Sequence, residues 1–215
     1  MPLRLTHLFG AIIVLGALAY GYMHYSGYVT RIKNSIKNRV YESDAISNYS
    51  KDVKSAAVEF DLSYPYLMAL IQLECGGRKP AGSRFEKHVF KRLKDVRDGN
   101  RENYENVTPK HLKDASDAAL KNLATSWGPF QLMGYKCILL GVKIKDIRGE
   151  EAVYYGAKWI DLAYGKRLRN EQFKDCFHIH NTGRPYPNNG RPTTHDPQYI
   201  PRGLAAIEKY KNAGK

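Results

Sequence analysis

The sequence predicts a mainly α-helical domain that follows an N-terminal membrane-targeting segment. Apolar residues recur at helical spacing from about residue 51 onward, and β-structure is expected at most as a small hairpin within residues 78–92. Residues 8–29 contain no Lys, Arg, Asp or Glu and are long enough to cross a bilayer. With 215 residues, 43% hydrophobic and 26% charged, the chain can form one globular domain and an appendage. We therefore expect a membrane segment over 1–29, a polar connector over 30–50 and one domain over 51–215.

The segment at residues 8–29 has three interpretations. As an anchor, it carries tyrosines toward one end, as at a membrane interface. As a signal peptide, it follows Arg4 and reaches Ala17-Leu18-Ala19, which fits cleavage after Ala19, although the usual polar stretch is missing. Its many Gly and Ala residues also fit an anchor that can later leave the membrane. We predict that residues 8–29 are an uncleaved anchor.

The charges around this segment conflict with an external location for the domain. Only Arg4 precedes the segment, whereas four basic residues follow it, namely Arg31, Lys33, Lys37 and Arg39. By the positive-inside rule, this distribution would keep the larger part of the chain in the cytoplasm.

The segment LSYPYLMALIQLECGG, residues 62–77, predicts a helix with defined ends. Ser63 is a favourable N-cap, Pro65 suits the first turn, and Gly76 and Gly77 supply a C-terminal stop. A separate helix is expected just before it, near residues 51–60.

Glu74 is the one carboxylate in this apolar segment. It falls on the same helical face as Leu67, Leu70 and Ile71, at positions i, i+3, i+4 and i+7. In the last turn, both desolvation and the negative end of the helix dipole disfavour its charged form. A carboxylic acid that keeps its proton near neutral pH is suited to general-acid catalysis. The alternative is a frayed helix end that turns Glu74 into solvent.

The rest of the domain is predicted from helical spacing and turns. Residues 78–110 are basic and rich in turns. Helices are expected near 110–124, within the end of SWGPFQLMGYKCILLG, and near 150–168, 170–180 and 197–212. Their apolar faces consist of Ala115, Ala118, Ala119 and Leu123; Val153, Gly156, Ala157 and Ile160; Phe173, Cys176, Phe177 and His180; and Ile200, Leu204 and Ile207.

The net charge of +13 and the pI of about 9.6 predict an anionic partner. Nucleic acid, an anionic lipid surface and bacterial wall polymers all fit this charge. The basic residues are spread among acidic ones and no nucleic-acid-binding module is recognisable, so nucleic acid is not the expected partner.

The three cysteines contain no Cys-x-x-Cys pair, which argues against a disulfide scaffold and a zinc ribbon. A single Cys137–Cys176 disulfide is left open. Cys75 is interpreted as a small buried residue rather than a nucleophile, because no His lies within a turn of it.

Four motifs occur in the order and at about the separations seen in peptidoglycan-cleaving enzymes of the lysozyme-like superfamily. They are LIQLECGG (70–77), RFEKHVFKRL (84–93), SWGPFQLMG (126–134) and HNTGRPY (180–186). Over about residues 51–210 the chain resembles the soluble lytic transglycosylase and N-acetylmuramidase branch, most specifically in the middle two motifs. The resemblance implies a lysozyme-like α+β fold and cleavage of the β-1,4 bond between N-acetylmuramic acid and N-acetylglucosamine in peptidoglycan.

The first and third motifs carry most of the implied site. Glu74 matches the catalytic acid of the family's ESGG-like helix end, with Cys75 in place of the serine. Ser126 and Gln131 match residues of the glycine-rich turn that lines the sugar cleft, and Met133 matches the residue just beyond. Gln131 could bond the sugar, or it could be buried and brace the turn.

The fourth motif is similar to the transglycosylase YNAG. By this match Asn181 corresponds to a polar group on the substrate side, whereas His180 stands where Tyr is usual. Trp127 and Tyr135 could stack on sugar rings, or they could be core residues of the turn.

Glu86 is the best candidate for a second carboxylate. A hydrolase usually uses such a group to aim water or stabilise the oxocarbenium-like centre, whereas a lytic transglycosylase uses the sugar's own hydroxyl and leaves a 1,6-anhydro ring. Arg84, Lys87 and His88 would keep Glu86 ionised, but an equally good interpretation is a salt bridge that holds the loop. No carboxylate occurs in residues 126–135, so transglycosylation is slightly favoured over hydrolysis.

Together these features predict a bacteriolytic enzyme that is anchored in the cytoplasmic membrane with its domain facing the wall, or that is carried in a virion. The main rival is a non-catalytic, membrane-anchored wall-binding or scaffold protein on a degenerate lysozyme-like fold. No cofactor is expected. No metal is expected either, because alternate helical positions diverge and no supporting carboxylate is evident near His178, His180 and His195.

Overall fold

The computed structural model describes residues 22–31, 33 and 45–213. By its contacts the chain divides into two units, Met1–Val40 and Tyr41–Lys215. In the first unit residues 22–31 are helical, and the predicted membrane segment at 8–29 lies largely outside the described residues. Of the helices described, none combines the length and apolar character needed to cross a membrane.

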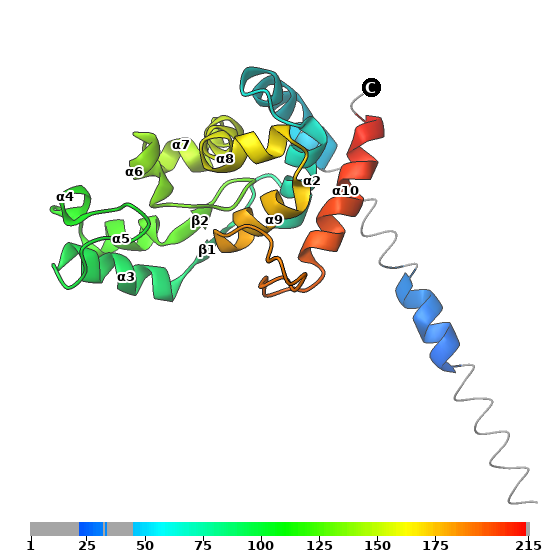
Figure 1. Cartoon of the computed structure of the whole chain (residues 1–215), viewed down its shortest axis with the longest axis horizontal. Helices are drawn as coiled ribbons and strands as arrows, with labels where there is room; N and C mark the ends of the chain where they lie inside the picture. The colour runs from blue at the N-terminus through cyan, green and yellow to red at the C-terminus, as the bar shows by residue number, and fades with distance from the viewer. Residues whose placement is uncertain (1–21, 32, 34–44, 214–215) are drawn as a thin grey trace, which may run out of the picture. The chain divides into compact units, whose positions relative to one another are not determined.

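The unit Tyr41–Lys215 is mainly α-helical with one small sheet, which confirms the coarse fold prediction (Figure 1). A helix at residues 45–59 comes first. It is followed by α2 (Tyr64–Cys75), β1 (Ser83–Phe85), α3 (Lys87–Arg97), α4 (Pro109–Leu112), α5 (Asp117–Leu123), β2 (Thr125–Trp127), β3 (Leu132–Met133), α6 (Lys136–Leu140), α7 (Ile144–Arg148), α8 (Ala152–Arg169), α9 (Phe173–Thr182) and α10 (Tyr199–Ala213).

The predicted hairpin within residues 78–92 is wrong. That region supplies β1 alone, and β1 pairs antiparallel with β2, which pairs antiparallel with β3. The hairpin therefore lies in the glycine-rich turn at residues 125–133. Strands of two or three residues are too short to show an alternating apolar pattern, so periodicity does not predict them.

The helices differ from the prediction in four places. The first helix of this unit includes residues 45–50 of the predicted connector, and it buries Ala45 and Tyr49. The region at 78–110 contains α3, and residues 144–148 form α7, and the sequence pattern predicts neither helix. The helix expected near 110–124 is two helices, because Ser116 caps a new start and accepts a hydrogen bond from the Ala119 N–H.

The buried side chains form two clusters. The larger one joins the helix at 45–59 to α2, α8, α9 and α10, and the predicted apolar residues Val153, Ala157 and Ile160 of α8 lie in it. The smaller one joins α3, α5, α6, α7 and the sheet. Figure 1 shows α3, α4, α5 and α6 toward one end of the unit and α2, α9 and α10 toward the other, and α8 lies beside α7 where the two groups meet.

The helix α2 has the ends predicted from the sequence. Ser63 is its N-cap and accepts a hydrogen bond from the Tyr66 N–H, Pro65 lies in the first turn, and Gly76 follows in the left-handed conformation. Six successive residues from Tyr66 to Ile71 are fully buried, so α2 is an interior helix over most of its length. Its half-buried residues are Tyr64 and Pro65 at the start and Gln72, Leu73 and Glu74 near the end.

Candidate active site

Glu74 lies in the last turn of α2 with its carboxylate partly buried. Leu67, Leu70 and Ile71, which were predicted to share its face, are completely buried, whereas the Glu74 side chain is 17% exposed. The helix does not fray before Glu74, because the Gly76 N–H still bonds to the Gln72 carbonyl. The carboxylate is therefore held in place and can still be reached from outside.

A tyrosine from the C-terminal helix contacts this carboxylate. Tyr199, the first residue of α10, donates a hydrogen bond from Oη to Glu74 Oε1. Burial, followed by the nearby charge of Glu74, raises the pKa of Tyr199 well above its ordinary value. The hydroxyl therefore keeps its proton and stays a donor. Because Oε1 is engaged, Oε2 is the oxygen that can carry a transferable proton.

His180 lies beside Glu74 and joins several elements. Its Nε2 is 4.0 Å from Glu74 Oε1 and 2.9 Å from the carbonyl oxygen of Phe130. Its Nδ1 is 2.9 Å from Tyr164 Oη, and Tyr164 accepts a hydrogen bond of 3.2 Å from Tyr66 Oη. A chain of hydrogen bonds thus connects α2, α8, α9 and the glycine-rich turn next to the acid.

The polar residues of the glycine-rich turn bond mainly within the turn. Ser126 Oγ donates to Gln131 Oε1 at 2.9 Å, and Gln131 Nε2 donates to the Gly128 carbonyl at 3.0 Å. Longer contacts join them to the segment of β1, since Ser126 Oγ is 3.3 Å from the Arg84 carbonyl oxygen and Gln131 Nε2 is 3.4 Å from that of Gly82. Gln131 adopts a φ of 48°, which is unusual for a residue with a side chain. These bonds support the interpretation of Gln131 as a brace of the turn. Gly128 has a φ of 71°, and a Cβ there would lie 2.5 Å from the Ile147 carbonyl oxygen, so the turn needs glycine at this position.

Glu86 is tied to its own loop. Its carboxylate lies 3.0 Å from Arg84 Nε and 3.6 Å from His88 Nδ1, and its backbone N–H donates to the Ala124 carbonyl. Glu86 precedes α3 without capping it through its side chain. The structure therefore does not bring Glu86 into the hydrogen-bond chain around Glu74, and the ion pairs fit the interpretation of a salt bridge that holds the loop.

The remaining candidates differ in exposure. Tyr135 is 5% exposed and packs with its ring 5.4 Å from that of Tyr104 in the smaller core, which supports the core interpretation. Trp127 is half-buried and donates from Nε1 to the Asn122 carbonyl. Met133 is half-buried in β3, and Asn181 is exposed near the end of α9.

The cysteines are free thiols, so the disulfide left open between Cys137 and Cys176 is not formed. These two residues lie in different cores, which explains why they do not meet. Burial raises the pKa of the Cys75 thiol to about 11, and its Sγ donates to the Ile71 carbonyl. Cys75 therefore behaves as the buried residue that the sequence predicted.

Within the described residues, no cluster of three or more His, Cys, Asp or Glu side chains is arranged to hold a metal ion. His178 is buried and has a structural role. Its Nδ1 is 2.7 Å from the Arg184 carbonyl oxygen, and its Nε2 accepts from the Thr193 N–H at 3.1 Å. It therefore fastens the loop between α9 and α10.

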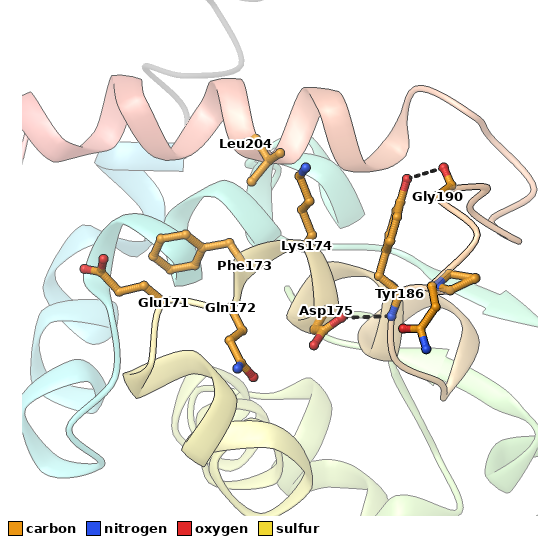
Figure 2. Close-up of a pocket in the computed structure, with 10 residues that line it drawn as sticks. Glu171, Gln172, Phe173, Lys174, Asp175, Tyr186, Gly190 and Leu204 are labelled. Carbon is orange, nitrogen blue, oxygen red and sulfur yellow. Dashed lines mark hydrogen bonds between the residues drawn. The ribbon is translucent and has the colours of Figure 1, made fainter.

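An open pocket of about 610 Å³ lies elsewhere, between the start of α9, Leu204 of α10 and the loop at residues 186–190 (Figure 2). Neither Glu74 nor His180 lines it. Its polar groups are partly engaged, because Asp175 Oδ1 accepts from the Tyr186 N–H and Tyr186 Oη donates to the Gly190 carbonyl. The pocket adds no acid or nucleophile to the chemistry around Glu74.

Sequence reasoning missed the three tyrosines around the candidate acid. Tyr199 lies 125 residues from Glu74, and Tyr66 lies 98 residues from Tyr164. The position of Tyr199 at the start of a predicted helix was the only signal, and it carried no information about Glu74.

Comparison of the chain with models of known protein families, with curated proteins and with solved structures gave no significant match.

Proposed function

We propose that this protein cleaves the β-1,4 bond between N-acetylmuramic acid and N-acetylglucosamine in peptidoglycan, with Glu74 as the general acid. The observation that carries the proposal is a single carboxylate, 17% exposed, on an otherwise buried helix face, with one oxygen held by a buried tyrosine. The motif resemblance supplies the substrate class, and the net charge of +13 suits an anionic wall polymer.

The chemistry requires a proton for the leaving oxygen of the glycosidic bond as an oxocarbenium-like centre forms. Tyr199 occupies Glu74 Oε1 and leaves Oε2 to deliver this proton. His180 and the carbonyl of Phe130 fix the glycine-rich turn beside the acid. Burial keeps the supporting hydroxyls of Tyr199 and Tyr164 protonated, so they support the acid as donors without competing as bases.

Lytic transglycosylation is the favoured outcome within this proposal. In the described chain, the polar side-chain contacts of Glu74 come from Tyr199 and His180, and neither is a carboxylate. A mechanism that uses the sugar's own hydroxyl needs no second acid. Hydrolysis by a muramidase-type mechanism is the alternative product of the same site.

Glu86→Gln distinguishes the two products. If Glu86 holds its loop through Arg84, the variant loses up to about 1 kcal/mol of stability, because the pair is partly exposed, and keeps both its rate and its products. The measurements are a thermal melt and mass spectrometry of digested peptidoglycan. A large loss of rate with an unchanged melt would instead assign Glu86 to the positioning of water and favour hydrolysis.

The proposed substrate requires the domain to act outside the cytoplasmic membrane. We propose that residues 8–29 anchor the chain with its domain toward the wall, or that a virion delivers it there. The basic residues that follow the segment oppose this orientation, but the charge rule is a bias that a weakly hydrophobic helix or a dedicated export route can override.

Protease accessibility of the domain in spheroplasts, combined with reporter fusions at residue 50 and at the C-terminus, tests the location. We expect the domain to be cleaved without lysis of the cells, or to be found in virions. A domain that stays protected in the cytoplasm, with no association with virions or secretion, would favour the non-catalytic scaffold.

A further inference from the structure

The hydrogen bonds of His180 define which of its nitrogens carries a proton. Nε2 lies 2.9 Å from the Phe130 carbonyl oxygen, which can only accept, so Nε2 is the donor. In a neutral imidazole the other nitrogen is then an acceptor, and Nδ1 lies 2.9 Å from Tyr164 Oη. The geometry fits the neutral Nε2–H tautomer with Tyr164 donating to Nδ1, and in this arrangement both tyrosine hydroxyls have an acceptor.

The tyrosines behind His180 are oriented consistently with this tautomer. Tyr66 Oη donates to Tyr164 Oη at 3.2 Å, so the Tyr164 proton is free to point at His180. Both hydroxyls are fully buried, and burial is the main cause that raises the pKa of each well above its ordinary value. The donors therefore run in one direction, from Tyr66 through Tyr164 to His180.

A second proton on His180 would disturb this chain. Nδ1–H would then face Tyr164 Oη, and one of the two buried tyrosine hydroxyls would lose its acceptor. The resulting imidazolium would lie 4.0 Å from Glu74 Oε1 and would favour the ionised carboxylate over the acid. A neutral His180 places no such positive charge beside the carboxyl group.

The other groups near Glu74 and His180 are neutral or paired. From α10, Tyr199 donates to the same Glu74 Oε1 that lies 4.0 Å from His180 Nε2, and burial keeps its hydroxyl neutral. Arg202, which acts on Tyr199, pairs with Asp196. On its own helix the neighbouring turn contributes Cys176, a buried thiol whose pKa is raised by burial to about 12.

We propose that Tyr164, whose hydroxyl accepts from Tyr66, holds His180 as the neutral Nε2–H tautomer, so that no imidazolium charge lies beside Glu74. His180 and Tyr164 are positioning residues in this scheme, since they act through Glu74. The proposal rests on the proposed function for its catalytic consequence, but the proton positions can be measured without a substrate.

The test compares wild type with Tyr164→Phe and with Tyr66→Phe as the matched control. Tyr164→Phe removes the donor to Nδ1, whereas Tyr66→Phe removes a hydroxyl of the same kind and leaves that donor in place. Long-range ¹H–¹⁵N correlation spectra of the labelled protein report the tautomer of His180 and its uptake of a second proton. The pH–rate profile for wall cleavage reports the consequence for Glu74.

We expect wild-type His180 to give the Nε2–H pattern. In Tyr164→Phe, we expect His180 to gain its second proton at a higher pH than in wild type, and the basic limb of the profile to move to lower pH, with about a fivefold loss of rate on that limb for one lost hydrogen bond. Tyr66→Phe should change both quantities less.

A wild-type Nδ1–H tautomer, or equal shifts in the two variants, would overturn the proposal. The spectra decide the His180 assignment even if the wall assay contradicts the proposed function, because they require no turnover. A folded Tyr164→Phe protein with an unshifted profile and an unshifted His180 titration would also contradict it.

Discussion

Replacing Glu74 by glutamine should lower the rate of wall cleavage by about 10²–10⁴-fold, the usual contribution of a general acid. The amide is nearly isosteric, and its carbonyl oxygen can still accept the hydrogen bond from Tyr199, so the fold should be retained. What the amide cannot do is give a proton to the leaving oxygen. Loss of turbidity of purified wall measures the rate, and a circular-dichroism melt measures the fold.

Glu150→Gln provides the control for this experiment. Glu150 is exposed in the turn before α8, and its substitution changes the net charge by the same amount without touching the site. It should keep the wild-type rate. Wall cleavage by Glu74→Gln within a few-fold of wild type would remove Glu74 from the role of acid.

Tyr199→Phe should lower kcat by about tenfold to a hundredfold and leave KM nearly unchanged. The phenyl ring fills the same buried space, so the variant loses one hydrogen bond to the carboxylate that forms as Glu74 gives up its proton. A bond to such a charged group typically contributes about 1.5–3 kcal/mol. Without this bond the carboxyl group can rotate, and Oε2 is no longer reserved for the substrate. Steady-state kinetics on soluble glycan fragments separates kcat from KM.

Tyr154→Phe is the matched control, because Tyr154 Oη also donates to a glutamate, Glu59 Oε1, at 2.9 Å on the surface. Loss of this exposed pair should not change kcat. An unchanged kcat in Tyr199→Phe would contradict a role of this bond in orienting the acid, and a lowered melting temperature beside it would show that the bond stabilises the fold instead.

The parts of the fold that were predictable are those set by local patterns. The ends of α2 follow from Ser63, Pro65 and Gly76, and its buried face follows from helical spacing. The same reasoning missed α3 because its charged residues mask the apolar positions Val89, Leu93 and Val96. It misplaced the sheet for two reasons: β1 pairs with a strand about 40 positions away, as in Arg84 with Ser126, and the local hairpin of β2 and β3 is too short to show an alternating pattern.

Of the candidate site, the sequence predicts the acid Glu74 but not the groups that hold it. Glu74 is recognisable because a carboxylate stands out in an apolar helix, but the groups that hold it come from α8, α9 and α10. No periodicity encodes contacts between residues so far apart in sequence. Gln131 is a case in which the residue type alone misleads. A glutamine is suited to a sugar contact, but the backbone conformation and hydrogen bonds of Gln131 direct its side chain to Ser126 and Gly128.

Mass spectrometry of purified peptidoglycan after incubation with the full-length protein tests the central claim most directly. Muropeptides released by wild type should carry 1,6-anhydro-N-acetylmuramic acid ends and should be absent with Glu74→Gln. Reducing ends in place of anhydro ends would keep the acid but change the reaction to hydrolysis. No release by folded wild type, or equal release by wild type and Glu74→Gln, would contradict the assignment of this protein as a peptidoglycan-cleaving enzyme that acts through Glu74.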